Sequence, residues 1–392
     1  MAARIKKHAR IFIIGLLLTA AFLLFQNHIK PAKFIHFKIY DALMRIKYQL
    51  KRPPRAIDDI VIVAIDNSTV SRMPHRWPYP RTVFASLINN LTTAEAKAVA
   101  FDFLFLGKSE NPEEDQVLAT ALENNNKVIL AGTIDERGAL RSRSTPLLNK
   151  KAPSGIVTKL QDPDGIIRQG LTYLVNDEVP PKAFLAWEMV ILKTVEGLNI
   201  EPVIGDESLI SIRNDNGEKW LVPVEARTKS FAINFRADTD DFKHISLYDA
   251  CKGDFEPSIV KDKIVMIGFV SSLLGDIHNT ALGWMPGVIL NANSFLTLYA
   301  HDFLSDSPPG IEELLTILGV IFSLMAALFL DIRTAALVIT IEIILFYAAS
   351  YALLTMGCVW DYFVFPFCVG LFPFLSKKIY ALIWQRKKFY WT

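Results

Sequence analysis

Four apolar runs constrain what this chain of 392 residues can fold into more than any other feature. The first lies at 11–29, behind a basic N-terminal stretch, and the others lie at 311–330, 335–354 and 360–376. A helix needs roughly 20 mainly apolar residues to cross the hydrocarbon core of a membrane, and each run reaches or approaches that length. The sequence therefore predicts four transmembrane helices.

Basic residues predict how these helices are oriented, because loops rich in Lys and Arg stay on the cytoplasmic side of the membrane. Basic residues are frequent in 377–392, after the last run, whereas the loop at 355–361 has none. Counting back through four passes, we expect 1–10 and the basic tail to be cytoplasmic and 30–306 to form an extracytoplasmic domain. In a bacterium, this describes a multi-pass protein of the inner (cytoplasmic) membrane with a periplasmic domain.

The composition argues against several other classes of protein. The net charge is only +2, so there is no global electrostatic case for binding nucleic acid. Three cysteines do not make a disulfide framework, and no Cys and His cluster has the spacing of metal ligands. The sequence lacks the common motifs for binding nucleotide cofactors and for catalysis. We therefore expect no cofactor, no metal and no enzymatic activity.

Strands and helices alternate in the predicted extracytoplasmic domain. Strands are predicted at 59–66, 96–105 and 127–132, with helices at 80–94 and 111–125 between them. This β-α-β-α-β order predicts parallel neighbouring strands. A further buried strand at 263–269 and a closing helix at 285–301 complete the domain. We expect an α/β fold with a mixed, largely parallel sheet and flanking helices.

Ligands of open α/β sheets bind beyond the carboxyl ends of the strands, which points to the residues there. Asp66, Asp102 and Asp276 lie late in the predicted strands or after them, and RWPYPR (76–81) follows the first strand. These stretches predict a pocket with acids, two guanidinium groups and an aromatic wall, whose candidate residues are Asp66, Arg76, Trp77, Arg81, Asp102 and Asp276. The alternative is structural: strand-end acids cap helices or pair with Arg, and a Trp-Pro stretch closes a core.

A catalytic alternative depends on two serines after the strand at 263–269. Ser271 or Ser272 would act as nucleophile, with His278 as base and Asp276 between them in the sequence. Close neighbours in sequence seldom adopt the geometry of a catalytic triad, so a hydrolase is the weaker interpretation.

Two features predict how a signal could cross the membrane. In the helix predicted at 33–52, Ile39, Leu43 and Ile46 lie on one apolar stripe with nearly heptad spacing. The stripe either packs on its own domain or pairs with a second copy of the chain. Glu342 lies well inside the third apolar run, where carboxylates are rare. It either bonds to a neighbouring helix or takes part in signal transfer.

Several long stretches resemble one family, the CHASE type-2 extracellular sensory domains. In family order they are IVIVAIDNSTV (60–70), RWPYPR (76–81), AVAFDFLF (98–105), DPDGIIRQG (162–170) and DIHNTALGWMPG (276–287). One predicted span before the domain and three after it also resemble the family layout. The resemblance implies a sensor that receives an outside stimulus and transmits it to a cytoplasmic kinase or cyclase, and it adds Thr280 to the candidate binding residues.

The chain also departs from the family pattern. Ile289 and Asn291 stand where the family has an acid and a His, and Ala281 follows Thr280 where the family usually has Pro. These exchanges motivate a second hypothesis, a structural or adaptor membrane protein of an envelope complex. Family relatives of this layout usually continue into a catalytic domain after the last span, and this chain stops at Thr392. We therefore expect a sensor to act through a separate cytoplasmic or membrane partner, or through a homodimer.

Overall fold

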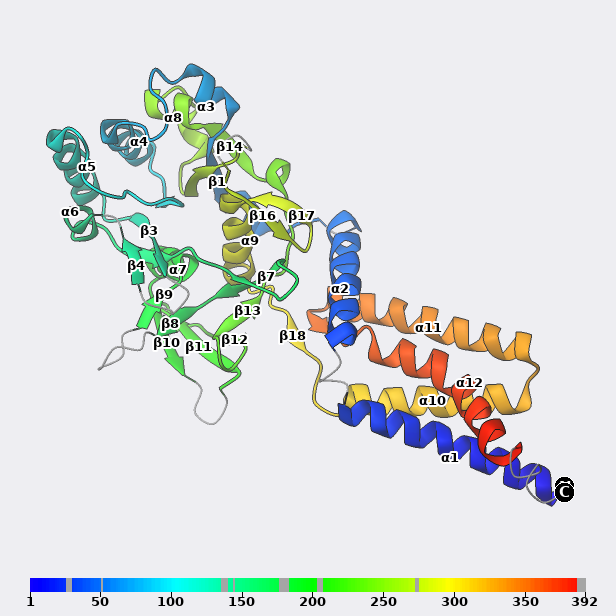
Figure 1. Ribbon diagram of the computed structural model, residues 1–392. Helices are drawn as coiled ribbons and strands as arrows, with labels where there is room; N and C mark the ends of the chain where they lie inside the picture. The colour runs from blue at the N-terminus through cyan, green and yellow to red at the C-terminus, as the bar shows by residue number, and fades with distance from the viewer. Residues whose placement is uncertain are drawn as a thin grey trace. The chain divides into compact units, whose positions relative to one another are not determined.

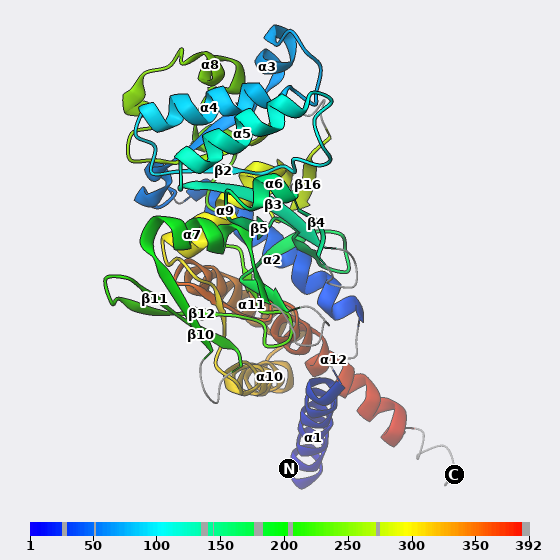
Figure 2. The same cartoon turned by 90° about the vertical axis from the view of Figure 1, so that its left-hand side faces the viewer.

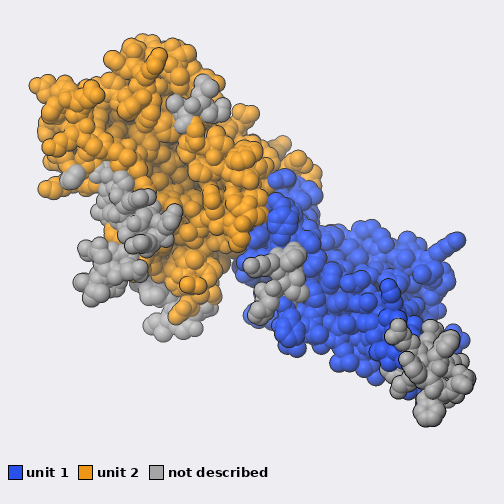
Figure 3. Space-filling view, viewed as in Figure 1, with its two compact units in different colours: residues 1–47, 305–392 blue, residues 48–304 orange. Residues whose placement is uncertain are grey.

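The computed structural model describes residues 1–25, 30–50, 52–134, 140–143, 145–175, 183–202, 207–271 and 275–385. Its contacts divide the chain into two compact units, coloured separately in Figure 3. Unit 1 consists of Met1–Lys47 and Ser305–Thr392, and unit 2 of Tyr48–Leu304.

Unit 1 is mainly helical, and four of its helices are long and apolar enough to cross a membrane. Its elements are α1 (Ala2–Phe25), most of α2 (Lys30–Leu50), β18 (Ser305–Asp306), α10 (Ile311–Phe329), α11 (Ile332–Thr355), β19 (Cys358–Val359) and α12 (Val364–Gln385). The four candidate spans are Arg4–Phe25, Ile311–Phe329, Ile332–Thr355 and Val364–Ile383. These helices mark the chain as a multi-pass membrane protein, as the four apolar runs predict.

Close packing joins the apolar helices of unit 1. Val320 and Leu324 of α10 are buried in one cluster with Cys368 and Val369 of α12. Gly15 of α1 lies against Leu324: a Cβ on this glycine would come within 2.7 Å of both Leu324 methyl groups. Small residues allow such close approach between membrane helices, where van der Waals packing drives association.

Unit 2 is built on a largely parallel sheet, as the sequence predicts (Figure 1). Its elements up to the middle of the unit are β1 (Ile60–Ile65), α3 (Asn67–Arg72), α4 (Arg81–Thr93), β2 (Ala98–Phe101), α5 (Pro112–Asn124), β3 (Val128–Ile134), β4 (Leu140–Arg143), α6 (Pro146–Asn149), β5 (Ser154–Ile156), β6 (Leu160–Gln161), β7 (Ile167–Leu171), β8 (Tyr173–Val175), β9 (Ala183–Leu185) and α7 (Trp187–Glu196). The remaining elements are β10 (Leu198–Pro202), β11 (Leu209–Asn214), β12 (Lys219–Pro223), β13 (Ser230–Ala232), β14 (Lys243–Ser246), α8 (Leu247–Lys252), β15 (Ile264–Phe269), β16 (Ile277–Thr280), β17 (Gly283–Pro286) and α9 (Gly287–Tyr299).

The strand order of the main sheet is β14-β1-β15-β2-β3, with all four neighbouring pairs parallel. β4 pairs antiparallel and β5 parallel with β3. The order differs from the simplest reading of the β-α-β-α-β sequence, because β15 lies between β1 and β2. The late strand β15 thus occupies the centre of the sheet, and the loop that follows it begins at the same carboxyl edge as those that follow β1 and β2.

Helices cover both faces of this sheet (Figure 2). Val61, Val63 and Ile65 of β1 face a buried cluster that includes residues of α4, α5, α6 and α8. α7 and α9 pack on the opposite face, where Val288 of α9 lies close to Gly268 of β15. Buried parallel strands are apolar on both faces for this reason, and β1 is buried at all of its positions.

A second sheet in unit 2 contains β17, the strand that directly precedes α9. Its path is β13-β7-β16-β17, and β6 also pairs with β7. β16 and β17 form an antiparallel hairpin, after which α9 begins at Gly287. Smaller antiparallel groups, β10-β11-β12 and β8-β9, complete unit 2. The hairpin places the first turn of α9 beside the segment that leads into β16, because the N–H of Gly287 donates to the carbonyl of Asp276 at 3.0 Å.

Candidate ligand site

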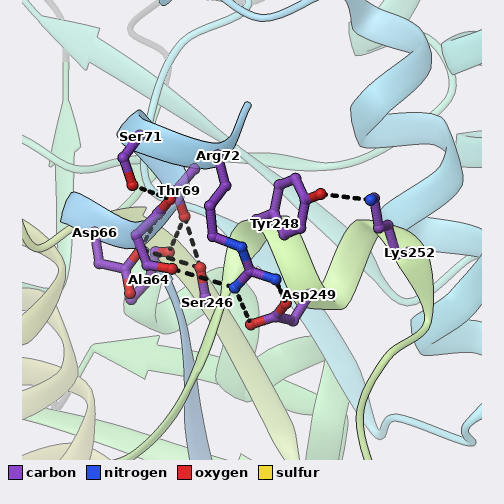
Figure 4. A network of polar contacts seen from close by, with 10 residues as sticks. Ala64, Asp66, Thr69, Ser71, Arg72, Ser246, Tyr248, Asp249 and Lys252 are labelled. Carbon is purple, nitrogen blue, oxygen red and sulfur yellow. Dashed lines mark hydrogen bonds and ion pairs between the residues drawn. The ribbon is translucent and has the colours of Figure 1, made fainter. Parts of the chain in front are cut away.

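The carboxylate of Asp66 caps helix α3 at the carboxyl end of β1 (Figure 4). Its Oδ1 accepts hydrogen bonds from the backbone N–H of Thr69, at 2.7 Å, and from the hydroxyl of Ser246, at 3.0 Å. The Thr69 and Ser246 hydroxyl oxygens are 2.9 Å apart, so the three side chains form one network. The sequence offered Asp66 as a ligand residue or as a helix cap, and the structure shows the cap.

Asp66→Ala removes this cap and should lower the free energy of unfolding by about 1–2 kcal/mol. Asp66→Asn keeps a side-chain oxygen in place, and Asn is as good an N-cap as Asp, so we expect less than about 0.5 kcal/mol of change. Chemical denaturation of the full-length protein in lipid nanodiscs measures both. An Asn variant as unstable as the Ala variant would contradict the capping role.

A second set of contacts lies near this cap (Figure 4). Nη1 and Nη2 of Arg72 donate to the two carboxylate oxygens of Asp249, at 3.1 and 2.7 Å. The same guanidinium lies 4.0 Å from the centre of the Tyr248 ring, and the ammonium of Lys252 lies 4.3 Å from it. Arg72 and Asp249 are therefore paired with each other, and the Tyr248 ring contacts both cations.

The RWPYPR stretch contributes to the core of unit 2. The Trp77 ring packs edge-on against Phe103 and Phe269, with ring centres 5.2 and 4.8 Å apart. Arg81 is buried, and its guanidinium pairs with Asp115 and donates to the carbonyl of Leu106 at 3.2 Å. Arg76 is exposed. The two guanidinium groups thus have different surroundings, and we find none of 76–81 in the wall of the cavity described next.

Asp102 and Asp276 line the same cavity, of about 270 Å³, in unit 2. Asp102 directly follows β2, and Asp276 directly precedes β16. The wall also includes the segment between β5 and β6, with Lys159, and the first turns of α9, with Asn291. Two of the predicted acids therefore lie in one cavity, in line with the expectation that ligands bind beyond the carboxyl ends of the strands.

Asp102 is the most perturbed acid of the cavity. Burial, and secondarily the charge of Asp276, raise the pKa of Asp102 from its ordinary 3.8 to about 8. A hydrogen bond of 2.8 Å from Nδ2 of Asn291 to Oδ1 partly opposes this rise. Oδ2 of Asp102 and Oδ1 of Asn291 are both buried and have no hydrogen-bond partner among the described residues. Buried polar atoms are normally paired, so these two oxygens are notable.

Lys159 is paired inside the protein. Its ammonium lies 2.6 Å from Oε1 of Glu188, and both side chains are almost fully buried. Glu188 is in the first turn of α7, where the positive end of the helix dipole favours a carboxylate. The charge of Lys159 is therefore neutralised before any ligand enters the cavity.

Asp276 occupies the N-terminus of α9. A Cβ on Gly287 would come 2.3 Å from Oδ2 of Asp276, so only a glycine leaves room for this carboxylate. Oδ1 of Asp276 lies 3.0 Å from Nε2 of His278. The carboxylate thus has a helix N-terminus on one side and an imidazole on the other.

Thr280 and Ser271 have contacts of other kinds. The hydroxyl of Thr280 donates to the carbonyl of Gly283 at 2.8 Å and accepts from the N–H of Leu282, which holds the β16–β17 turn. The hydroxyl of Ser271 donates its proton to Oδ1 of Asn67 at 2.5 Å, so that proton is engaged away from the proposed base. Ser272, the other nucleophile considered, lies outside the described residues.

The signal-transfer candidates lie in unit 1. Leu43 is buried and Ile39 half-buried, whereas Ile46 is 40% exposed. The buried side of α2 includes Lys47, whose ammonium donates to the carbonyl of Leu354 at 3.0 Å. The predicted apolar stripe and the buried side of the helix therefore overlap only in part.

Glu342 bonds to a neighbouring apolar helix. Its Oε2 accepts a hydrogen bond of 2.6 Å from the hydroxyl of Ser323, and it therefore joins α11 to α10. This is the structural alternative that the sequence offered for an intramembrane acid. A part in signal transfer stays a prediction.

Reasoning from the sequence missed the Lys159–Glu188 pair and the amide that bonds to Asp102. The sequence gives a weak indication of this pair. Glu188 is a lone acid in the apolar stretch LAWEMVIL (185–192), a pattern that indicates a buried charge with a partner. Asn291 was noted only as a departure from a family pattern, and the structure shows that it bonds to Asp102.

The fold and the four apolar helices define the class, a multi-pass membrane protein that carries an α/β domain. The sequence matches the CHASE2 domain family over residues 13–327, and the chain belongs to this family. CHASE2 is an extracellular sensory domain rather than a catalytic one. No curated protein and no solved structure was found to match the chain.

Proposed function

We propose that this protein is an integral membrane sensor that detects a small molecule in the cavity between Asp102, Asp276 and Asn291. The observation that carries the proposal is the pair of buried oxygens without partners, on Asp102 and Asn291, in the wall of a cavity of about 270 Å³. Ligand cavities commonly measure about 300–1,000 Å³, so this one suits a small ligand. Membership of a sensory family supports the same function.

A ligand screen tests this proposal. A chemically mixed library is added to the full-length protein in nanodiscs, and thermal unfolding is recorded. We expect a saturable stabiliser whose effect is lost in Asp102→Asn, since a ligand at 100 times its Kd stabilises the folded state by about 2.7 kcal/mol. The exposed Asp254, in the turn after α8, provides the control Asp254→Asn. Stabilisers that act equally on both variants would argue against a sensor site here.

We further propose that unit 2 lies outside the cytoplasm, at the bacterial inner membrane, with both termini inside. In a variant without native cysteines, Glu110→Cys in unit 2 should react with an impermeant maleimide on intact spheroplasts. Lys378→Cys, in the C-terminal part of α12, should react only in inverted vesicles. Both sites are exposed in the structure. The reverse pattern of labelling would overturn the orientation.

The signal would pass through the apolar helices to a separate cytoplasmic or membrane partner. Cross-linking and co-purification from native membranes test for such a partner and for a homodimer. A partner recovered in equal amount with wild type and Asp102→Asn, with no ligand response in either, would favour a structural or adaptor protein instead.

A further inference from the structure

Each group of the cavity that could attract an anion already has a partner within the protein. Lys159 is paired with Glu188 at 2.6 Å, and the N-terminus of α9 faces the carboxylate of Asp276. His278 lies 3.0 Å from the same carboxylate. An anionic ligand would therefore find no free cation among these groups, and it would be repelled by Asp276.

When Asp102 is ionised, the two buried atoms left without a partner are hydrogen-bond acceptors. Within the part of the chain that the structure describes, Oδ2 of Asp102 and Oδ1 of Asn291 have no hydrogen-bond partner, and the two residues are only 8% and 4% exposed. One N–H of the Asn291 amide donates to Oδ1 of Asp102. Leaving buried acceptors unsatisfied is unfavourable, so a ligand that donates hydrogen bonds gains most here.

The remaining wall combines apolar side chains with the polar Thr158 and Gln161. Val157, Ile167 and Leu290 line the cavity beside the acceptors. Among the described residues, no group of three or more His, Cys, Asp or Glu side chains could hold a metal ion. These walls suit a short hydrocarbon chain with a charged end better than a bare cation.

From these contacts we infer that the cavity takes a small organic cation, an alkylamine or alkylguanidine, whose N–H groups donate to Asp102 Oδ2 and Asn291 Oδ1. The inference rests on the proposed function and names its ligand class. An ammonium or guanidinium group would pair with the ionised form of Asp102, so binding should release the proton that this buried acid holds. Asp276, Lys159, Glu188 and His278 surround Asp102 and are present with and without the ligand.

The test uses three four-carbon compounds that differ in charge: putrescine, 1,4-butanediol and succinate, with agmatine and ethanolamine as further amines. Calorimetry on the full-length protein in nanodiscs should show saturable binding of at least one amine and none of the diol or succinate. Affinity should rise with pH between 6 and 8, and titration in buffers of different ionisation enthalpy should show proton release.

Two variants locate the site. Asp102→Asn should weaken amine binding at least about tenfold, because it removes a charge-assisted hydrogen bond. Asn291→Leu, which keeps the acid and removes the second acceptor, should also weaken it, and Asp254→Asn should not. If Asp102→Asn fails to fold, amine binding by Asn291→Leu still shows whether the amine binds in this cavity.

The outcomes separate this inference from the proposed function. Failure of all three amines to bind, or binding that neither cavity variant weakens, overturns the inference. A neutral or anionic stabiliser that depends on Asp102 also overturns it, but leaves the sensor function in place.

Discussion

Stability should fall as the pH rises from about 5 to 8, and Asp102→Asn should remove much of that fall. Burial holds the pKa of Asp102 near 8 in the folded protein, against an ordinary value of 3.8. Between these values the folded state keeps a proton that the unfolded state releases. Its stabilising effect is complete below pH 3.8 and is lost as pH rises toward 8, with a slope of the order of 1 kcal/mol per pH unit.

Urea denaturation of the full-length protein at several pH values measures this slope. Asn at 102 has no proton to lose, and its side-chain oxygen can still accept from Asn291, so the variant should fold. Asp276, His278, Lys159 and Glu188 are present in both proteins, so the difference between the two slopes isolates the contribution of Asp102. Asp254→Asn should keep the wild-type slope. Equal slopes for wild type and Asp102→Asn would show that Asp102 is ionised in the folded protein.

The sequence predicted the strands and apolar helices well because both depend on local patterns. The strand predicted at 59–66 is β1, Ile60–Ile65, and the helix predicted at 111–125 is α5, Pro112–Asn124. The order of the strands could not be predicted in the same way. A parallel strand buried on both faces is apolar throughout, and its sequence does not specify its neighbours. The position of β15 between β1 and β2 therefore emerged only from the structure.

The candidate site was predictable only where the sheet itself determines position. Asp102 and Asp276 meet because both lie at the carboxyl edge of the sheet. Lys159, Glu188 and Asn291 come from segments whose contacts depend on how α7 and α9 pack, and no local pattern shows this. Glu114 illustrates the same limit within one helix. It lies in the first turn of α5, and its carboxylate accepts from the backbone N–H of Arg81, at the start of α4, at 3.0 Å.

Arg81→Met should lower the free energy of unfolding by about 3–5 kcal/mol, because it leaves the buried carboxylate of Asp115 without its cation. Arg76→Met, in the same RWPYPR stretch, is the matched control. Arg76 is exposed, so its replacement should change stability by less than about 0.5 kcal/mol. Chemical denaturation of the full-length proteins in nanodiscs measures both changes.

The pair also separates a structural role from a binding role. If Arg81 contacted a ligand rather than the core, Arg81→Met would weaken ligand binding while leaving the unfolding midpoint near wild type. The double variant Arg81→Met, Asp115→Leu replaces both charges by apolar groups. It should recover part of the lost stability, because it removes the unpaired acid that makes the single variant unstable. If the double variant is no more stable than Arg81→Met, the unpaired Asp115 does not cause the loss of stability. The loss then comes from the hydrogen bonds that Arg81 donates to the carbonyls of Leu106 and Gly107.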